Sequence, residues 1–367
     1  MKKAIALLTA LLVLSLWGVT AYADDAGLDG GVGETVWPLK GNPVVMEKEY
    51  INIRVVGGKS YVTCIFDFYN PGDETSMLVG FPSEDVISGY DKERDEHYYY
   101  DMRLHKFTTK INGEKKEIKR KKGKVVYDKE MERTGYPIWF TWKMHFNKGE
   151  RVRVVNTYWM NNSYYNGLRD QEIEYILQSG RNWKDAIGSV CVKMSFDKLL
   201  PYEIYADMGL APTGMTADGS LLWEYKSIEP EEDIEVGVES ELDDYFDYDL
   251  QKAFDKKRYK NVIKDCEKYI EENGSDEGDY YMMGRSYYEL KDYQKAIECF
   301  KLLNDGIGRY HEALTYLKMG DTMACVTILE RMIRQPDADY PLLTLWARAQ
   351  YRACVMNWIR YRHGQAD

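Results

Sequence analysis

The residue patterns that usually carry catalysis are missing from this sequence. It has no His-Glu-x-x-His pair, no Gly-x-Ser-x-Gly elbow, no Gly-Lys-Ser/Thr phosphate loop and no Cys-x-x-Cys. Histidine is scarce, and the five residues lack the close spacing of metal ligands: His97, His105, His145, His311 and His363. We therefore expect no cofactor and no metal. A carboxylate pair for glycoside hydrolysis stays open, because such partners meet only in space.

Long apolar runs are absent except at the start of the chain. Lys2 and Lys3 precede an apolar run from Ala4 to Val19, and Ala21-Tyr22-Ala23 has the small-x-small form of a cleavage site. This pattern predicts a signal peptide over residues 1–23, cut after Ala23, and a secreted or extracytoplasmic protein. Since no later stretch of about eighteen residues is apolar and uncharged, we expect no membrane span in the mature chain.

Positive charge is in deficit, with 49 Lys and Arg against 60 Asp and Glu and a net charge of −11. We therefore expect no nucleic-acid partner. One basic cluster of seven residues within ten goes against this balance. It is a candidate site for an anionic envelope polymer, although such charges also serve to protect an edge strand from aggregation. The cluster comprises Lys115, Lys116, Lys119, Arg120, Lys121, Lys122 and Lys124.

Apolar and polar residues alternate with a period of two from Val44 to about Val238. The dipeptide Asn112-Gly113 predicts a type I′ hairpin turn, which needs positive φ at both central residues. Many short strands separated by turn signals predict an antiparallel β-sandwich over residues 24–238, with its core beginning near residue 44. The clearest strands are expected at 51–55, 62–68, 138–146, 152–158, 172–177, 190–196 and 221–225.

The β-rich region also carries a series of short motifs. They are Phe66-Asp67-Phe68-Tyr69-Asn70, Val79-Gly80-Phe81-Pro82, Gly180-Arg181-Asn182-Trp183 and Ile187-Gly188. The series resembles an uncharacterised domain family of secreted bacterial proteins. The resemblance covers roughly half of the chain, as one domain of typical size does. It implies an extracytoplasmic β-domain without a known activity, and it brings no catalytic residue across.

An acidic segment separates the β-rich region from the helices. Eleven of the twenty-one residues from Glu229 to Asp249 are Asp or Glu, and none is Lys or Arg. Residues 234–238 fit a last strand, and residues 239–249 read as a solvated linker. Carboxylates also suit Ca²⁺, but the Asp/Asn-x-Asp-x-Asp-Gly loop is absent, which favours the linker.

A helical hairpin is the clearest pattern of the C-terminal part, from Asp279 to Leu303. Gly284 and Tyr287, followed by Tyr293, Ala296 and Phe300, resemble a tetratricopeptide repeat. The same pattern recurs 34 residues upstream and, in a shortened form, 29 residues downstream. We predict a multidomain all-β plus all-α protein, with tetratricopeptide-like repeats and a terminal capping helix over residues 250–360.

By this resemblance, the first helix of each repeat presents residues to a groove that binds a protein or peptide partner. We expect an exported, non-catalytic binding or scaffold protein of the bacterial envelope or exterior. The alternative is an extracellular enzyme that acts on envelope polysaccharide through an unrecognised carboxylate pair. The Lys and Asn residues that clamp a terminal carboxylate in some family members are absent. The groove residues implied are Asp247, Gln251, Tyr281, Arg285, Tyr288 and Tyr310.

The six cysteines show no clear disulfide framework. Export permits bridges, but Cys266 and Cys325 stand at repeat-core positions that call for small apolar residues. Cys64 shares a strand face with Phe66, whereas Cys191 lies on the face opposite Val192, which disfavours a Cys64–Cys191 bridge. The pattern favours buried free thiols, and it leaves the disulfide state open.

Overall fold

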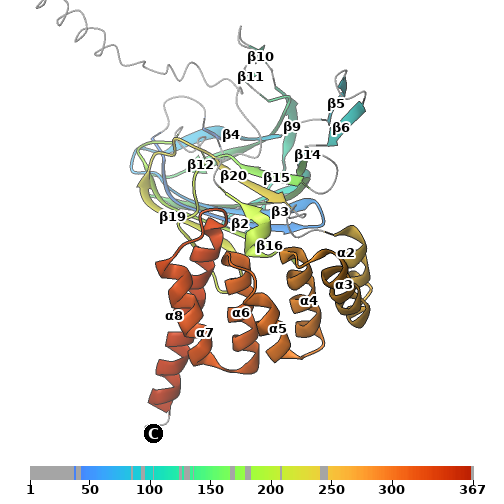
Figure 1. The fold of residues 1–367 in the computed structure, drawn as a ribbon. Helices are drawn as coiled ribbons and strands as arrows, with labels where there is room; N and C mark the ends of the chain where they lie inside the picture. Colours follow the sequence, from blue (N-terminus) through green and yellow to red (C-terminus); the bar gives the residue numbers. More distant parts are fainter. Residues whose placement is uncertain are drawn as a thin grey trace, which may run out of the picture.

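The computed structural model describes residues 37–38, 43–83, 86–91, 96–101, 103–123, 126–127, 133–134, 136–165, 170–177, 183–206, 209–239 and 247–364. The predicted signal peptide, Lys124 and most of the predicted acidic linker lie outside these residues. Within them the chain forms a β-rich N-terminal region followed by seven α-helices. Figure 1 shows the helices side by side in a row, packed along one side of the strands.

Alternating burial explains why the long strands form. On β13 (Arg151–Asn161), Val152, Val154, Asn156, Tyr158 and Met160 are buried, and the residues between them are partly or fully exposed. This period of two is that of a strand with one face in a core. The remaining long strands are β2 (Val45–Val56), β3 (Lys59–Tyr69), β4 (Thr75–Ser83), β12 (Ile138–Phe146), β16 (Ile187–Phe196) and β19 (Leu221–Ile228).

The remaining strands are shorter. They are β1 (Trp37–Pro38), β5 (Val86–Asp91), β6 (Glu96–Asp101), β7 (His105–Ile111), β8 (Glu114–Lys115), β9 (Lys119–Lys122), β10 (Val126–Tyr127), β11 (Arg133–Thr134), β14 (Ser163–Tyr165), β15 (Asp170–Tyr175), β17 (Ile204–Tyr205), β18 (Gly214–Met215) and β20 (Ile234–Glu239). The predicted turn between β7 and β8 is present, because φ is 51° at Asn112 and 88° at Gly113.

Three larger sheets share one core. Their strand orders are β18-β19-β16-β2-β3-β13-β7-β8, β1-β4-β12-β9 and β14-β15-β20-β17. Phe107 of β7 stacks on Phe140 of β12 with ring centroids 4.7 Å apart, and Phe81 of β4 meets Tyr158 of β13 at 5.5 Å. The expectation of purely antiparallel sheets is wrong, because β16 pairs with β2 in parallel.

Most of the described helices begin at an aspartate. Asp276, Asp292, Asp305 and Asp321 each accept a hydrogen bond from a backbone N–H of the first turn that follows. Such N-caps satisfy donors that have no partner inside a helix. The helices are α2 (Tyr248–Asp255), α3 (Tyr259–Asn273), α4 (Glu277–Glu289), α5 (Tyr293–Phe300), α6 (Gly306–Met319), α7 (Thr322–Arg334) and α8 (Pro341–Gly364).

Close packing inside the predicted hairpin depends on Gly284. Helices α4 and α5 form the hairpin, and a Cβ added at Gly284 would lie 2.5 Å from the Phe300 ring.

Cys266 and Cys325 are buried in the repeat cores as predicted, and all six cysteines are free thiols. Within the described residues, no helix is long and apolar enough to cross a membrane.

Candidate functional site

A segment of the β-rich region docks on the helices at the short 3₁₀ helix η2 (Pro201–Glu203). The Tyr202 hydroxyl lies 3.0 Å from the Tyr281 hydroxyl and 2.7 Å from His311 Nε2. Its ring meets Tyr310 edge to face, with centroids 5.4 Å apart. Pro201 and Tyr202 are buried. The segment therefore occupies the part of the helical array where the predicted groove residues gather.

Arg285 extends this contact into a polar network. Its guanidinium donates to the Tyr281 hydroxyl at 3.3 Å and to Gln251 Oε1 at 3.2 Å, and it lies 4.4 Å over the Phe254 ring. Burial, followed by the charge of Arg285, lowers the pKa of His311 to about 3. The imidazole is therefore neutral at physiological pH. Each of these hydrogen bonds has one donor and one acceptor if Tyr281 donates to Tyr202 and Tyr202 donates to His311.

The predicted groove residues have three different settings. Tyr281 and Tyr310 are buried beneath Tyr202, so at these two positions the groove holds the chain's own segment. Gln251 and Arg285 bond to each other. Asp247 is exposed and caps α2 through the Leu250 N–H, and Tyr288 packs against Tyr293. Sequence reasoning missed Tyr202 and His311, since no pattern in Pro201–Glu203 points to the helices.

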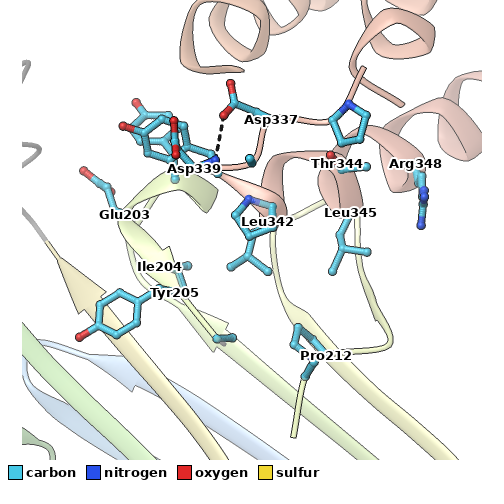
Figure 2. Close-up of a pocket in the computed structure, with 17 residues that line it drawn as sticks. Glu203, Ile204, Tyr205, Pro212, Asp337, Asp339, Leu342, Thr344, Leu345 and Arg348 are labelled. Atoms are coloured by element: carbon cyan, nitrogen blue, oxygen red, sulfur yellow. Dashed lines mark hydrogen bonds between the residues drawn. The ribbon is translucent and has the colours of Figure 1, made fainter. Parts of the chain in front are cut away.

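Beside η2, a cleft of about 790 Å³ lies between the β-rich region and α8. Its floor is apolar, and Ile204, Pro212, Leu342 and Leu345 contribute to it. Figure 2 shows Leu342 and Leu345 between Asp339 at one end and Arg348 at the other. The volume falls within the range of small-molecule and cofactor sites. No feature of the sequence indicated this cleft, because its two walls are about 130 residues apart in the chain.

Some charged side chains of the cleft have hydrogen-bond partners within the protein, and others do not. Asp337 accepts from the Asp339 N–H at 3.1 Å (Figure 2). It also accepts from Gly306 N at 2.6 Å, and it pairs with Arg309 at 3.4 Å. Glu203 accepts from Leu200 N at 2.6 Å, and burial raises the pKa of its carboxyl. Asp339 and Arg348 are exposed, and neither side chain has a hydrogen bond or ion pair within the described ranges. These two are the charges available to a ligand.

A polar row is buried inside the β-rich core. Cys64, Asn156 and Thr109 lie opposite one another on β3, β13 and β7, and Tyr175 donates to Glu49 Oε1 at 3.2 Å. Burial raises the pKa of Glu49 to about 8, so its carboxyl is protonated at neutral pH. Both side-chain atoms of Asn156, Thr109 Oγ1 and Glu49 Oε2 have no partner among the described residues. The row can hold a proton, but solvent does not reach it.

Most of the basic cluster lies on one strand. Lys119, Arg120, Lys121 and Lys122 make up β9 and are all exposed. Lys115 is also exposed, and Lys116 pairs with Glu114 at 3.0 Å.

Among the described residues, no group of three or more His, Cys, Asp or Glu side chains is arranged to hold a metal ion.

The comparison with protein families matches one segment of the chain. A tetratricopeptide repeat model matches residues 280–305, which are most of α4 and α5. This agrees with the predicted resemblance, and a repeat of this kind suggests protein partners. The predicted uncharacterised β-domain family is not matched. No curated protein matches the chain.

Solved structures resemble the chain only weakly. A candidate nutrient-binding protein from Legionella pneumophila is 17% identical, with a TM-score of 0.43 over 57% of this chain and 70% of that one. Yeast LTA4 hydrolase in complex with bestatin is 8% identical, with a TM-score of 0.28 over 53% of this chain and 28% of that one. A mutant M1 zinc metallopeptidase from Deinococcus radiodurans, bound to a Tyr-Ser-Ala substrate, is 10% identical, with a TM-score of 0.27 over 85% and 81%.

These findings correct the expected function. The solved structures similar to the chain are zinc metallopeptidases and a candidate nutrient-binding protein rather than repeat scaffolds, and the expectation of a non-catalytic repeat scaffold is not kept. The structure adds a physical reason, because Tyr202 fills the groove that such a scaffold would present at Tyr281 and Tyr310. At these identities and TM-scores, no residue role and no activity of the peptidases is carried over. The chain is similar to a tetratricopeptide protein over residues 280–305 alone.

Proposed function

We propose that this protein binds short peptides with free ends in the cleft between its β-rich region and α8. The observation that supports the proposal is the cleft itself, with an apolar floor between two unpaired side chains of opposite charge. Apolar walls with a few placed polar groups are the usual composition of a ligand site. A peptide supplies a positive end, a negative end and apolar side chains between them.

The length of the cleft suits three or four residues. Arg348 lies seven positions after Pro341, the first residue of α8, which corresponds to about 10.5 Å along the helix, and Asp339 stands two residues before Pro341. An extended peptide spans about 3.3–3.6 Å per residue, so a tetrapeptide covers about 13–14 Å. Arg348 suits the terminal carboxylate, since a guanidinium binds a carboxylate through two parallel hydrogen bonds. Asp339 then faces the terminal ammonium group.

Calorimetric titration with an Ala-Leu-Leu-Ala tetrapeptide tests the proposal. We expect Arg348→Ala to weaken binding about tenfold or more, because it removes a charge-assisted hydrogen bond worth about 1.5–3 kcal/mol. Amidating the peptide's C-terminus is expected to weaken binding to the unchanged protein and to have no further effect on the variant. Arg352→Ala is the matched control, since Arg352 is exposed on the same helix and does not line the cleft.

Two results would contradict the proposal. One is the absence of binding by the unchanged protein, and the other is equal affinity of the Arg348 and Arg352 variants. Mass spectrometry of the peptide after incubation shows whether it is returned intact or cleaved.

We also propose that the protein is exported. The support is the sequence pattern of Lys2, Lys3 and the apolar run Ala4 to Val19 before Ala21-Tyr22-Ala23. Sequencing the N-terminus of the protein recovered from expressing bacteria should give a chain that begins at Asp24. A mature protein that retains Lys2 and Lys3 would contradict export by cleavage.

A further inference from the structure

Strand β9 lies at the edge of its sheet. The order β1-β4-β12-β9 places it at one end, where Lys119 to Lys122 pair with Thr141 to Ile138 of β12. On its other side β9 pairs with no strand that the structure describes. An unpaired edge presents backbone N–H and C=O groups that can hydrogen-bond to another extended chain.

The charges of β9 have no partners in the part of the chain that the structure describes. Lys119, Arg120, Lys121 and Lys122 are exposed, and none forms an ion pair there. Two other exposed cations of the β-rich region are paired: Arg151 with Glu47 at 2.9 Å and Arg153 with Asp67 at 2.6 Å. The chain carries eleven more acidic than basic charges, so carboxylates are not scarce. Four like charges side by side repel one another until an anionic partner binds.

From this edge, we infer that β9 binds an extended acidic peptide segment as an added strand. Successive side chains of a strand point to opposite faces, so β9 presents two cations on each face. An acidic strand beside it would place acidic residues opposite these cations, with the roughly 4.5–5.5 Å between Cβ atoms that is typical of cross-strand pairs. Strand addition supplies affinity through the backbone, and the side chains supply the selection.

A polyanion without a peptide backbone, such as an envelope polymer, would use the charges but not the open edge. If the charges only protect the edge strand from aggregation, no ligand binds there. Among these three readings, only strand addition requires the partner's amide N–H groups. This requirement makes the inference testable without knowledge of the natural partner.

The test measures fluorescence anisotropy of a labelled eight-residue peptide with the repeat Glu-Glu-Val-Val, which places glutamates on both strand faces, with the full-length protein. We expect saturable binding that weakens as salt increases, since salt screens exposed charges. Replacing all four β9 cations with glutamine (Lys119→Gln, Arg120→Gln, Lys121→Gln, Lys122→Gln) should reduce affinity at least tenfold. The matched control replaces four exposed cations of the helices: Lys256→Gln, Lys260→Gln, Lys264→Gln and Lys268→Gln.

The same peptide with every backbone amide methylated tests the backbone requirement. Strand addition predicts at least a tenfold loss, because no amide N–H donor remains on either edge of the peptide. The inference would be overturned if the methylated peptide and inorganic polyphosphate both bound as tightly as the unmethylated peptide. β9 would then be a site for any polyanion. No binding, or equal loss in both quadruple variants, would overturn it entirely. The single variant Lys121→Glu, with its melting curve, separates lost binding from lost folding.

Discussion

At the scale of single residues, the buried polar row makes the β-rich core sensitive to pH. Glu49 is 1% exposed, and burial outweighs the hydrogen bond from Tyr175 in setting its pKa. A carboxyl group buried without a charged partner stays protonated, because the interior solvates the ionised form poorly. The native protein therefore holds a proton that the unfolded chain releases near pH 4.5.

We expect the stability of the protein to decrease as the pH rises from about 5 to about 8. In this window the pKa of Glu49 is near 8 in the native state and 4.5 in the unfolded state, so the unfolded state binds fewer protons. The free energy of unfolding then falls by up to about 1.4 kcal/mol per pH unit and levels off above pH 8.

Urea unfolding at several pH values measures this slope. Glu49→Gln should flatten it, because glutamine does not titrate, while the exposed control Glu117→Gln should keep it. An unchanged slope in the Glu49 variant would show that another group carries the pH dependence.

At the scale of elements, the helical hairpin depends on one close approach. Alanine favours a helix over glycine by about 1 kcal/mol. At Gly284, however, the added Cβ would lie 2.5 Å from the Phe300 ring, and that ring is buried and stacked on His311. The ring can move only by displacing its neighbours, so overpacking exceeds the gain in helix propensity.

Gly284→Ala should therefore destabilise the protein by about 1–3 kcal/mol. Thermal and urea unfolding both measure this change. Glu289→Ala, at an exposed position of the same helix, should leave stability within about 0.5 kcal/mol. A more stable Gly284 variant would mean that the hairpin is packed more loosely than described.

The elements that could be predicted are those defined by local patterns. Alternation in Val152 to Met160 indicated β13, and Asn112-Gly113 indicated the turn between β7 and β8, because strand period and backbone conformation depend on neighbouring residues. The parallel pairing of β16 with β2 could not be predicted, since it depends on contacts between distant segments. The same applies to the candidate site. Tyr281, Arg285 and Tyr310 do gather on one side, but no local pattern shows that Tyr202 covers them.

At the scale of the whole molecule, Tyr202 joins the two parts of the chain. Its hydroxyl serves both Tyr281 and His311, and its loss would leave these buried groups without their shared partner. A buried polar group left unsatisfied costs about 1–3 kcal/mol. A second contact lies at α8, where Gln350 Nε2 donates to Ala217 O at 2.6 Å.

Tyr202→Phe should lower the free energy of unfolding by about 1–3 kcal/mol while keeping the ring in place. Hydrogen exchange should show faster opening of α4 and α6, which contribute Tyr281 and His311. Tyr269→Phe removes the same hydroxyl at a site that is 53% exposed, and it should change neither quantity. Equal effects of the two substitutions would mean that the buried network does not join the parts.

The parallel pair of β2 and β16 also sets an order of folding. Its partners, such as Glu49 and Val190, are about 140 residues apart, whereas each helix hairpin closes within about 30 residues. Contacts between distant residues form slowly, because a long loop must close first. The helices can therefore assemble before the strand region that presents Tyr202 is complete. In that order of folding, we expect Tyr281 and Tyr310 to stay open to solvent until Tyr202 docks.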